Sequence, residues 1–163
     1  MFIRYLVVIF ILFFLINPCP SFSWQGEVIS VYDGDSLQIR NIKGEIVKIR
    51  VYGVDCPEIG QPYGDEARLM TEKVLLGRTV DVVTAQKSKS YGREVSGLLL
   101  MDDMIVLQDV LVSAGLAWVD ERFCKLPVCE LWKLHQRDAI SNRRGLWAEK
   151  NPIPPWTWRS LRK

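Results

Sequence analysis

Two acidic clusters in the first half of the chain could bind a metal ion. Asp33 and Asp35 flank Gly34 in one predicted turn, and Asp55 and Glu58 lie in a second turn further along the chain. If the strands before these turns are neighbours, both turns lie at one rim and the carboxylates meet. Clustered carboxylates usually indicate a bound cation, and their oxygen atoms suit a hard ion such as Ca²⁺ or Mg²⁺. Taken alone, Asp33 is more simply explained as a turn residue.

Two arginines accompany these acids. Arg50 lies inside the apolar stretch 49–54, where an unpaired guanidinium would be costly to bury, and Arg93 follows Tyr91 and Gly92 where a loop meets a strand. Each could simply form a structural ion pair. Together with the carboxylates they indicate hydrolysis of a phosphodiester. In that reaction arginine holds equatorial oxygens, a cation polarises another oxygen, and a carboxylate outside the metal shell orients or deprotonates water.

Composition excludes chemistry based on several histidines. The 163 residues contain one histidine, His135, so neither a histidine pair nor a three-histidine metal site fits a single chain. His135 falls on an apolar helical stripe, which favours a core position. The net charge of +2 hides a basic C-terminal region, with eight basic and two acidic residues over 133–163. With Trp156 and Trp158 interleaved, this region is either a solvated surface or part of a polyanion-binding face.

Short runs of β-branched and aromatic residues separated by turn residues predict a small barrel. Three strands, a helix, two strands and then helices follow in order. This order predicts a mainly β fold with helices (α+β), a five-stranded OB-fold Greek-key barrel with about three packed helices. The Pro-rich segment 151–158 is expected to run over the surface as an extended tail. The expected strands are 27–32, 36–40, 46–52, 78–84 and 94–100, and the expected helices begin near Pro62, at Val106 and near Val128.

The first 23 residues predict an export signal. Arg4 precedes an unbroken apolar run over 5–16, which is too short to cross a bilayer as a helix, and residues 21–23 form a small-x-small cleavage site. We therefore expect a signal peptide over 1–23, a globular domain over 24–148 and a basic Pro/Trp-rich tail over 149–163. The alternatives are an uncleaved membrane anchor through residues 5–16 and a lipid-modified Cys19.

Two cysteines are expected to form a disulfide. Cys124 and Cys129 flank a short loop that contains Pro127, and an exported protein meets oxidising surroundings. The rival interpretation is a zinc site that uses Cys56, Cys124, Cys129 and His135. The spacing of Cys124 and Cys129 is loose for zinc, and Cys56 lies in the acidic second turn.

Five segments of the chain closely resemble the staphylococcal nuclease (thermonuclease-like) family in their order and spacing. They extend over residues 26–147 and read VYDGDSLQI, KIRVYGVDCPE, YGDEA, SYGREVSGLL and LVSAGLAWV. The resemblance implies a five-stranded barrel with packed helices. It also implies a Ca²⁺-dependent endonuclease, a phosphodiesterase that hydrolyses DNA and RNA.

The resemblance implies metal ligands at three positions. Asp35 and Asp55 match the metal-binding carboxylates of the family, and the main-chain carbonyl of Cys56 falls where a carbonyl completes the metal shell. The prototype of the family has threonine at the position of Cys56. A main-chain ligand survives that exchange, whereas a contact from the side-chain hydroxyl is lost.

The resemblance also implies catalytic and substrate-binding roles. Glu58 matches the general base, or the residue that positions the attacking water, and Arg50 and Arg93 match the arginines that hold the phosphate in the transition state. Tyr91 falls on an aromatic position near the nucleotide. The chain departs from the prototype at Ser90, where the prototype has lysine, and in a shorter loop over 59–63. These departures concern substrate contacts and leave the reaction class unchanged.

These observations predict an exported, secreted or periplasmic nuclease that uses calcium and acts on DNA and RNA as a monomer. No stable protein partner is implied, and no membrane association unless the N-terminal segment is retained. One alternative is a non-catalytic OB-fold module that binds nucleic acid or protein. Such modules normally lose several of the acids and arginines, whereas this chain has all five. A third interpretation is a membrane-tethered interaction protein that keeps residues 1–23 as its anchor.

Overall fold

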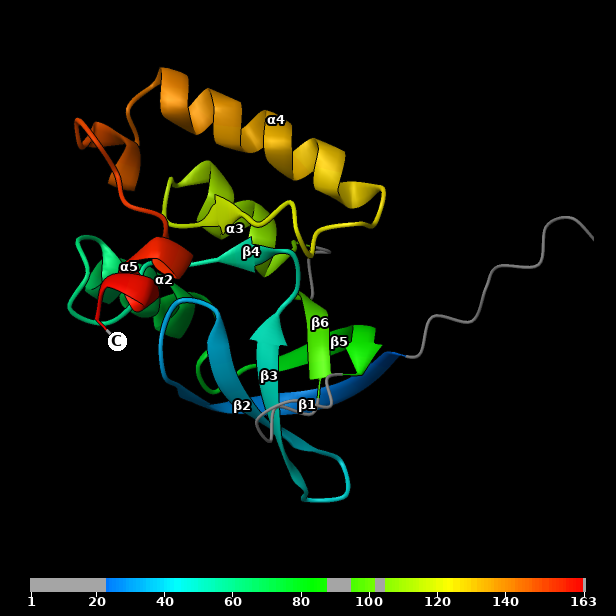
Figure 1. Cartoon of the computed structure of the whole chain (residues 1–163). Coiled ribbons are helices and arrows are strands. Elements are labelled where there is room, and N and C mark those ends of the chain that lie inside the picture. Colours follow the sequence, from blue (N-terminus) through cyan, green and yellow to red (C-terminus); the bar gives the residue numbers. More distant parts are fainter. Residues whose placement is uncertain (1–22, 88–94, 102–104, 163) are drawn as a thin grey trace, which may run out of the picture.

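The computed structural model describes residues 23–87, 95–101 and 105–162. The predicted signal peptide, Cys19, Tyr91 and Arg93 therefore lie outside the described residues. Within the described ranges five strands close into a barrel in the order β1-β2-β3-β6-β5 (Figure 1). All neighbouring pairs are antiparallel except β3 and β6, which are parallel. The strands are β1 (Ser23–Val31), β2 (Ser36–Asn41), β3 (Ile46–Val51), β5 (Thr79–Lys87) and β6 (Val95–Leu100).

The barrel forms because alternate residues of its strands are apolar and point inward. Each such side chain contributes about 1.5–3 kcal/mol when it is fully buried. The predicted five-stranded α+β fold is confirmed, with the strand order of a small Greek-key barrel. The buried residues that fill the barrel include Val28, Leu37, Ile39, Ile49, Val51, Val80, Val82 and Leu99.

Three helices pack where the sequence predicts them. They are α2 (Gly64–Leu75), α3 (Leu107–Ser113) and α4 (Val128–Ser141). In Figure 1, α3 lies between the barrel and α4, which forms the outermost layer. Trp132 of α4 is fully buried. None of the described helices combines the length and hydropathy that spanning a bilayer requires.

The predicted core position of His135 is only partly correct. His135 is half-buried, and its Nδ1 lies 3.6 Å from Asp109 Oδ1. Leu131, which lies one helical turn before His135 on the same apolar stripe, is 44% exposed. The apolar face of α4 is narrower than the sequence pattern indicates, because α3 covers only part of it. Trp132 and Ala139 lie on the buried side.

Two short strands were not predicted. β4 (Val54–Asp55) pairs antiparallel with β7 (Trp118–Val119) and forms a separate two-stranded sheet. Strands of two residues have no periodicity from which they could be recognised. This small sheet pairs Asp55 with Trp118, whose ring packs against Trp156 in the C-terminal part of the chain.

The prediction of an extended tail over 151–158 is wrong from Pro155 onward. The chain forms a 3₁₀ helix η1 (Gly145–Ala148), runs extended past Pro152 and then forms α5 (Pro155–Leu161). Proline is well suited to the first helical position, because its fixed φ matches a helix and its missing N–H is not needed there. Trp156 packs edge-on against Trp118, with ring centroids 5.7 Å apart. The tail is therefore folded onto the domain and does not run loosely over it.

The predicted disulfide between Cys124 and Cys129 is present. It closes the loop before α4. The hydroxyl oxygen of Tyr52 accepts hydrogen bonds from the main-chain N–H groups of Lys125 and Leu126 in the same loop. Cys56 is buried with a free thiol. The rival zinc site is excluded, because two of its four ligands are joined to each other and cannot act as thiolates.

Candidate active site

Asp35 and Asp55 converge at one end of the barrel. Asp35 lies in the turn between β1 and β2, and Asp55 ends β4. Their side chains are 1% and 3% exposed. The main-chain N–H of Cys56 donates to Asp35 Oδ2 at 2.7 Å, and the N–H of Val51 donates to the carbonyl of Asp35 at 2.8 Å. These bonds join the two turns, so the carboxylates of both turns lie at one rim.

Gly34 lets the first turn pack directly against the second. A Cβ at this position would lie 2.7 Å from Cys56 Sγ and 2.8 Å from Ala67 Cβ of α2. The hydroxyl of Thr71 on α2 donates to the Gly34 carbonyl at 2.7 Å. Asp33 Oδ1 accepts the N–H of Asp35 at 3.0 Å, which fits its predicted role as a turn residue. The turn that carries Asp35 is thus held from three sides.

Arg50 lies between the two buried carboxylates. It lies on β3 opposite Ser36 of β2. One terminal nitrogen forms an ion pair with Asp35 Oδ1, and the other forms one with Asp55 Oδ1. Ser36 Oγ also accepts a hydrogen bond from Arg50, at 3.1 Å. A planar guanidinium fork can contact both carboxylates at once, which a lysine ammonium on a single stem cannot do in the same way.

Burial and neighbouring charges determine the charge states in this cluster. Burial, together with the charges of Asp33 and Asp55, raises the pKa of Asp35 well above its ordinary value, against the opposing effect of Arg50. Burial by itself lowers the pKa of Arg50, but the two carboxylates outweigh it and raise the pKa. Burial and the charge of Asp35 raise the pKa of the Cys56 thiol. This shift favours the neutral thiol, which leaves the main-chain carbonyl of Cys56 as its oxygen donor.

Glu58 lies at the open edge of this cluster. Its side chain is 30% exposed, and its main-chain N–H donates to Gln61 Oε1 at 3.0 Å. The start of α2 packs closely against it, because a Cβ at Gly64 would lie 2.0 Å from the Glu58 carbonyl oxygen. The backbone of Glu58 is therefore fixed while its carboxylate reaches solvent. A carboxylate in this position can orient or deprotonate a water molecule.

Arg159 of α5 completes the cluster and was not among the residues predicted from the sequence. Its guanidinium contacts Asp55 Oδ2 at 2.7 Å and Glu58 Oε1 at 2.5 Å. The only sequence signal was general, since Arg159 belongs to the basic and Trp-rich C-terminal region. Nothing in that pattern indicated that this region returns to the acidic turns.

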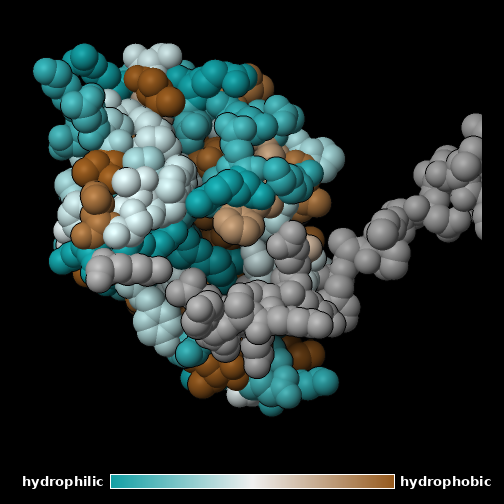
Figure 2. Space-filling view, viewed as in Figure 1, coloured by the Kyte–Doolittle hydropathy of each residue, from teal (hydrophilic) through white to brown (hydrophobic). Residues whose placement is uncertain are grey.

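The structure brings together five of the residues predicted from the sequence, whereas the predicted phosphate contact Arg93 and the predicted substrate contact Tyr91 lie outside the described residues. Figure 2 shows hydrophilic residues gathered in a band between the helical layer and the barrel, on the side where α5 lies in Figure 1. The five residues that meet are Asp35, Arg50, Asp55, Cys56 and Glu58.

The donor set fits a hard divalent cation. Among the described residues no group of three or more His, Cys, Asp or Glu side chains is arranged to hold a metal ion. Two buried carboxylates and a main-chain carbonyl nevertheless offer oxygen ligands, and Ca²⁺ commonly completes such a set with water. Among the described residues, four carboxyl groups gather in this cluster, and two guanidinium groups contact them. The carboxylates are those of Asp33, Asp35, Asp55 and Glu58, and the guanidinium groups are those of Arg50 and Arg159.

Comparison with known proteins places this cluster in a family. The model of the staphylococcal nuclease homologue family matches residues 48–149. This range contains Arg50, Asp55 and Glu58, whereas Asp35 and Arg159 lie outside it.

Three relatives illustrate the similarity. An uncharacterized endonuclease of Escherichia coli is 36% identical over 145 residues, which cover 85% of this chain and 91% of that protein. A micrococcal nuclease of Shigella flexneri is 26% identical over 157 residues, which cover 91% of this chain and 88% of that protein. A probable staphylococcal-like nuclease of Oryza sativa subsp. japonica is 32% identical over 134 residues, 79% of this chain and 39% of that protein. The chain belongs to the family of staphylococcal nuclease homologues.

Proposed function

We propose that this protein is an exported, Ca²⁺-dependent nuclease that hydrolyses phosphodiester bonds of DNA and RNA. Family membership and relatives that are named endonuclease and micrococcal nuclease support nuclease activity. The observation that carries the proposal is that Asp35, Asp55, Glu58 and Arg50 meet at one rim, with acids and a guanidinium in direct contact. This combination of groups can promote phosphodiester hydrolysis.

Asp35, Asp55 and the carbonyl of Cys56 are the proposed calcium ligands. When bound, the ion supplies positive charge beside a phosphate oxygen and so favours attack at phosphorus. Burial of the two carboxylates and the bonds that fix their turns keep these ligands in place before the ion arrives. A preorganised ligand set loses little conformational entropy on binding.

Glu58 and Arg50 are the proposed catalytic residues on the described part of the chain. Glu58 accepts a proton from the attacking water, or orients that water, from its half-exposed position at the rim. Arg50 keeps its ion pairs with Asp35 and Asp55, and the N–H groups that these pairs leave unused can donate to the oxygens on which negative charge develops. Arg93 is the proposed second arginine of this kind, and Tyr91 the proposed aromatic contact to the nucleotide. Both of these roles depend on the sequence resemblance.

Export is supported by two observations. The first 23 residues have the pattern of a signal peptide, and the Cys124–Cys129 disulfide is typical of a protein that meets an oxidising compartment. We propose that the mature enzyme is monomeric and free of the membrane. N-terminal sequencing of the exported product tests this directly, because a product that still begins at Met1 would indicate an anchored protein.

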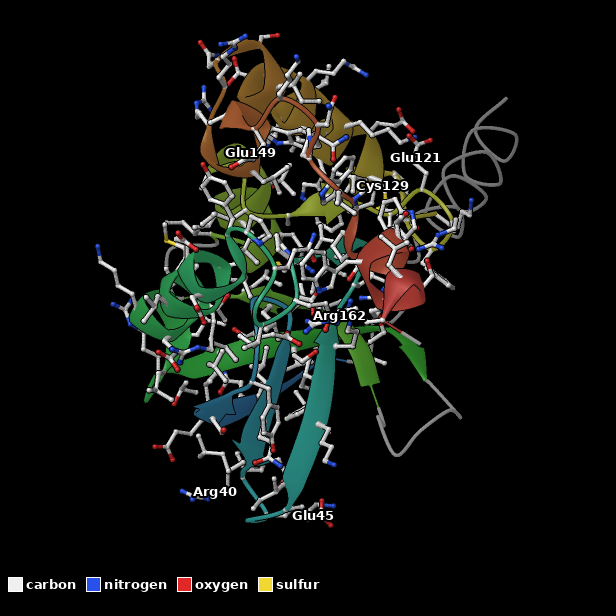
Figure 3. All side chains as sticks on the ribbon, turned by 60° about the vertical axis from the view of Figure 1, so that its left-hand side comes forward. Arg40, Glu45, Glu121, Cys129, Glu149 and Arg162 are labelled. Carbon is white, nitrogen blue, oxygen red and sulfur yellow. A yellow bond between two sulfur atoms is a disulfide. The ribbon has the colours of Figure 1, made fainter. Side chains whose placement is uncertain are left out.

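The test of the proposed chemistry is a cleavage assay on plasmid DNA and on RNA with Ca²⁺, with Mg²⁺ or with a chelator. Glu58→Gln should slow Ca²⁺-dependent cleavage by about 10²–10⁴-fold, because the substituted amide cannot accept the proton. Glu45→Gln is the matched control, since Glu45 lies at the opposite end of the barrel from α5 (Figure 3). Both variants should keep the circular dichroism spectrum of the parent protein.

Undiminished cleavage by Glu58→Gln would refute the role of this carboxylate. An absence of cleavage by the parent protein under every metal condition, with nucleic acid still bound, would instead favour the non-catalytic binding module. Cleavage that persists in the chelator would refute the metal requirement.

A further inference from the structure

The C-terminal helix is seated on the candidate active site by contacts that involve no acidic residue. Gln61 Nε2 donates to the carbonyl of Ile153 at 2.6 Å, which holds the segment before α5 against the second acidic turn. Trp156 packs on Trp118, and the guanidinium of Arg122 lies 4.6 Å from the centroid of the Trp156 ring. Figure 3 shows α5 beside the barrel, with Arg162 near its end. The backbone of α5 therefore keeps its place even if Arg159 changes its contacts.

Arg159 donates hydrogen bonds to the carboxylates of Asp55 and Glu58, which the proposed reaction requires. Its Nη2 contacts Asp55 Oδ2 at 2.7 Å, and its Nη1 contacts Asp55 Oδ1 at 3.1 Å and Glu58 Oε1 at 2.5 Å. Because Arg50 also binds Asp55 Oδ1, both oxygens of Asp55 are occupied by guanidinium groups. The bonds to Asp55 and Glu58 raise the pKa of Arg159, so its positive charge is permanent.

The two arginines differ in how easily their contacts can be exchanged. The Arg50 side chain is 21% exposed and lies between buried carboxylates, whereas the Arg159 side chain is 40% exposed and reaches the site from outside. When Arg159 leaves, Asp55 keeps its ion pair with Arg50, and the carboxylate of Glu58, which is 30% exposed, is solvated by water. Arg159 can therefore leave Asp55 and Glu58 at small cost, whereas Arg50 cannot.

We propose that Arg159 is a further active-site residue that competes with the divalent cation for Asp55, holds Glu58 until the cation binds, and so determines the metal affinity of the enzyme. This inference rests on the proposed function, in which Asp55 is a calcium ligand. A cation on Asp55 has to approach the same carboxylate oxygens that Arg159 now contacts, and it repels the guanidinium. Metal binding thus displaces Arg159 from Asp55 and, in the same event, frees Glu58 to act on water.

Calcium titration of the metal-free full chain, without nucleic acid, tests the inference by isothermal calorimetry. Arg159→Gln should bind Ca²⁺ roughly ten-fold more tightly than the parent protein, because the ion pair with Asp55 no longer has to be broken and one repelling charge is gone. Arg162→Gln is the matched control. It removes the same charge directly after the same helix, and among the described residues the guanidinium of Arg162 contacts the Trp158 ring and no carboxylate. Its affinity should equal that of the parent protein.

The Ca²⁺ affinity of Arg159→Lys is a second test, in which the positive charge is kept. Lysine keeps the charge but cannot contact Asp55 and Glu58 through one fork, so its Ca²⁺ affinity should lie between those of the parent protein and Arg159→Gln. In cleavage assays the Ca²⁺ concentration for half-maximal rate should follow the same order.

The outcomes separate this inference from the proposed function. If the parent protein binds Ca²⁺ and cleaves nucleic acid, but Arg159→Gln binds Ca²⁺ equally or more weakly, the inference is wrong and the proposed function stands. Weaker binding would show that Arg159 positions the ligands and does not compete with the metal. If none of the proteins binds Ca²⁺, the calcium site is wrong and the inference fails with it.

Discussion

Replacing Arg50 by methionine should strongly destabilise the fold. The change leaves Asp35 and Asp55, whose side chains are 1% and 3% exposed, facing each other without the guanidinium that lies between them. Removing one partner of a buried ion pair typically costs about 3–5 kcal/mol, and the 21% exposure of Arg50 places the expected loss near the lower limit, about 3 kcal/mol. For a domain of this size that loss lowers the melting temperature by on the order of 10 °C.

The loss should increase with pH. Burial already raises the pKa of Asp35, and removing Arg50 takes away the charge that opposes this rise. Between the ordinary pKa of about 4 and the raised folded value, the folded protein holds a proton that the unfolded chain has released, so stability falls as pH rises. Arg50→Met should therefore be closer to the parent protein in stability at pH 5 than at pH 8.

The measurement is denaturant unfolding of the metal-free protein in a chelator at both pH values. Arg40→Met is the control, because Arg40 forms an exposed ion pair with Glu27 at the end of the barrel far from α5 (Figure 3). That pair should contribute less than about 1 kcal/mol. In the double variant Arg50→Met/Asp35→Asn, one buried charge is gone and part of the lost stability should return. Equal losses for Arg50→Met and Arg40→Met, or no gain in the double variant, would refute the buried charge pairing described here.

Two further predictions concern a glycine of the site and the disulfide. Gly34→Ala should lose roughly 1–3 kcal/mol of unfolding free energy and bind Ca²⁺ more weakly, because its Cβ would lie 2.7 Å from Cys56 Sγ. The control is Gly44→Ala, where the Cβ meets open space but φ is +81°; it should lose about 1–2 kcal/mol and keep the parent affinity for Ca²⁺. Unfolding and calorimetry measure both, and an unchanged affinity in Gly34→Ala would contradict the prediction. Replacing Cys124 and Cys129 by serine should lower the free energy of unfolding in guanidinium by about 2 kcal/mol, since the disulfide closes a short loop. Equal stability of the oxidised parent protein and this variant would contradict the prediction.

The barrel could be predicted from the sequence because the pattern that specifies each strand lies within the strand itself. Strands such as 36–40 and 46–52 alternate apolar and polar residues and end at turn residues, so their existence and order follow without knowledge of distant contacts. The convergence of Asp35, Arg50 and Asp55 was predictable for a related reason. Arg50 pairs with Ser36 in adjacent antiparallel strands, and the second turn begins where that pairing ends.

The rest of the site depends on contacts that leave no local pattern. β4 and β7 have two residues each, and their pairing brings residues 54–55 beside residues 118–119. The tail was expected to be extended because of its prolines, although Pro155 can equally begin a helix. Arg159 lies 104 residues from Asp55 along the chain, and its ion pair exists only because α4 and η1 direct the C-terminal segment back over the acidic turns.

We therefore expect opposite effects when the two arginines that contact Asp55 are replaced, although both form ion pairs with the same carboxylate. Arg50 compensates charges that folding has removed from water, so its loss appears first as lost stability in the metal-free protein. When Arg159 is lost, Asp55 keeps its ion pair with Arg50, so the loss leaves stability nearly unchanged and appears as tighter metal binding. Measuring unfolding and Ca²⁺ affinity on both variants thus separates an arginine that the fold requires from an arginine that the metal ion replaces. If both changes lowered stability equally and neither raised Ca²⁺ affinity, α5 would be a structural clamp on the acidic turns.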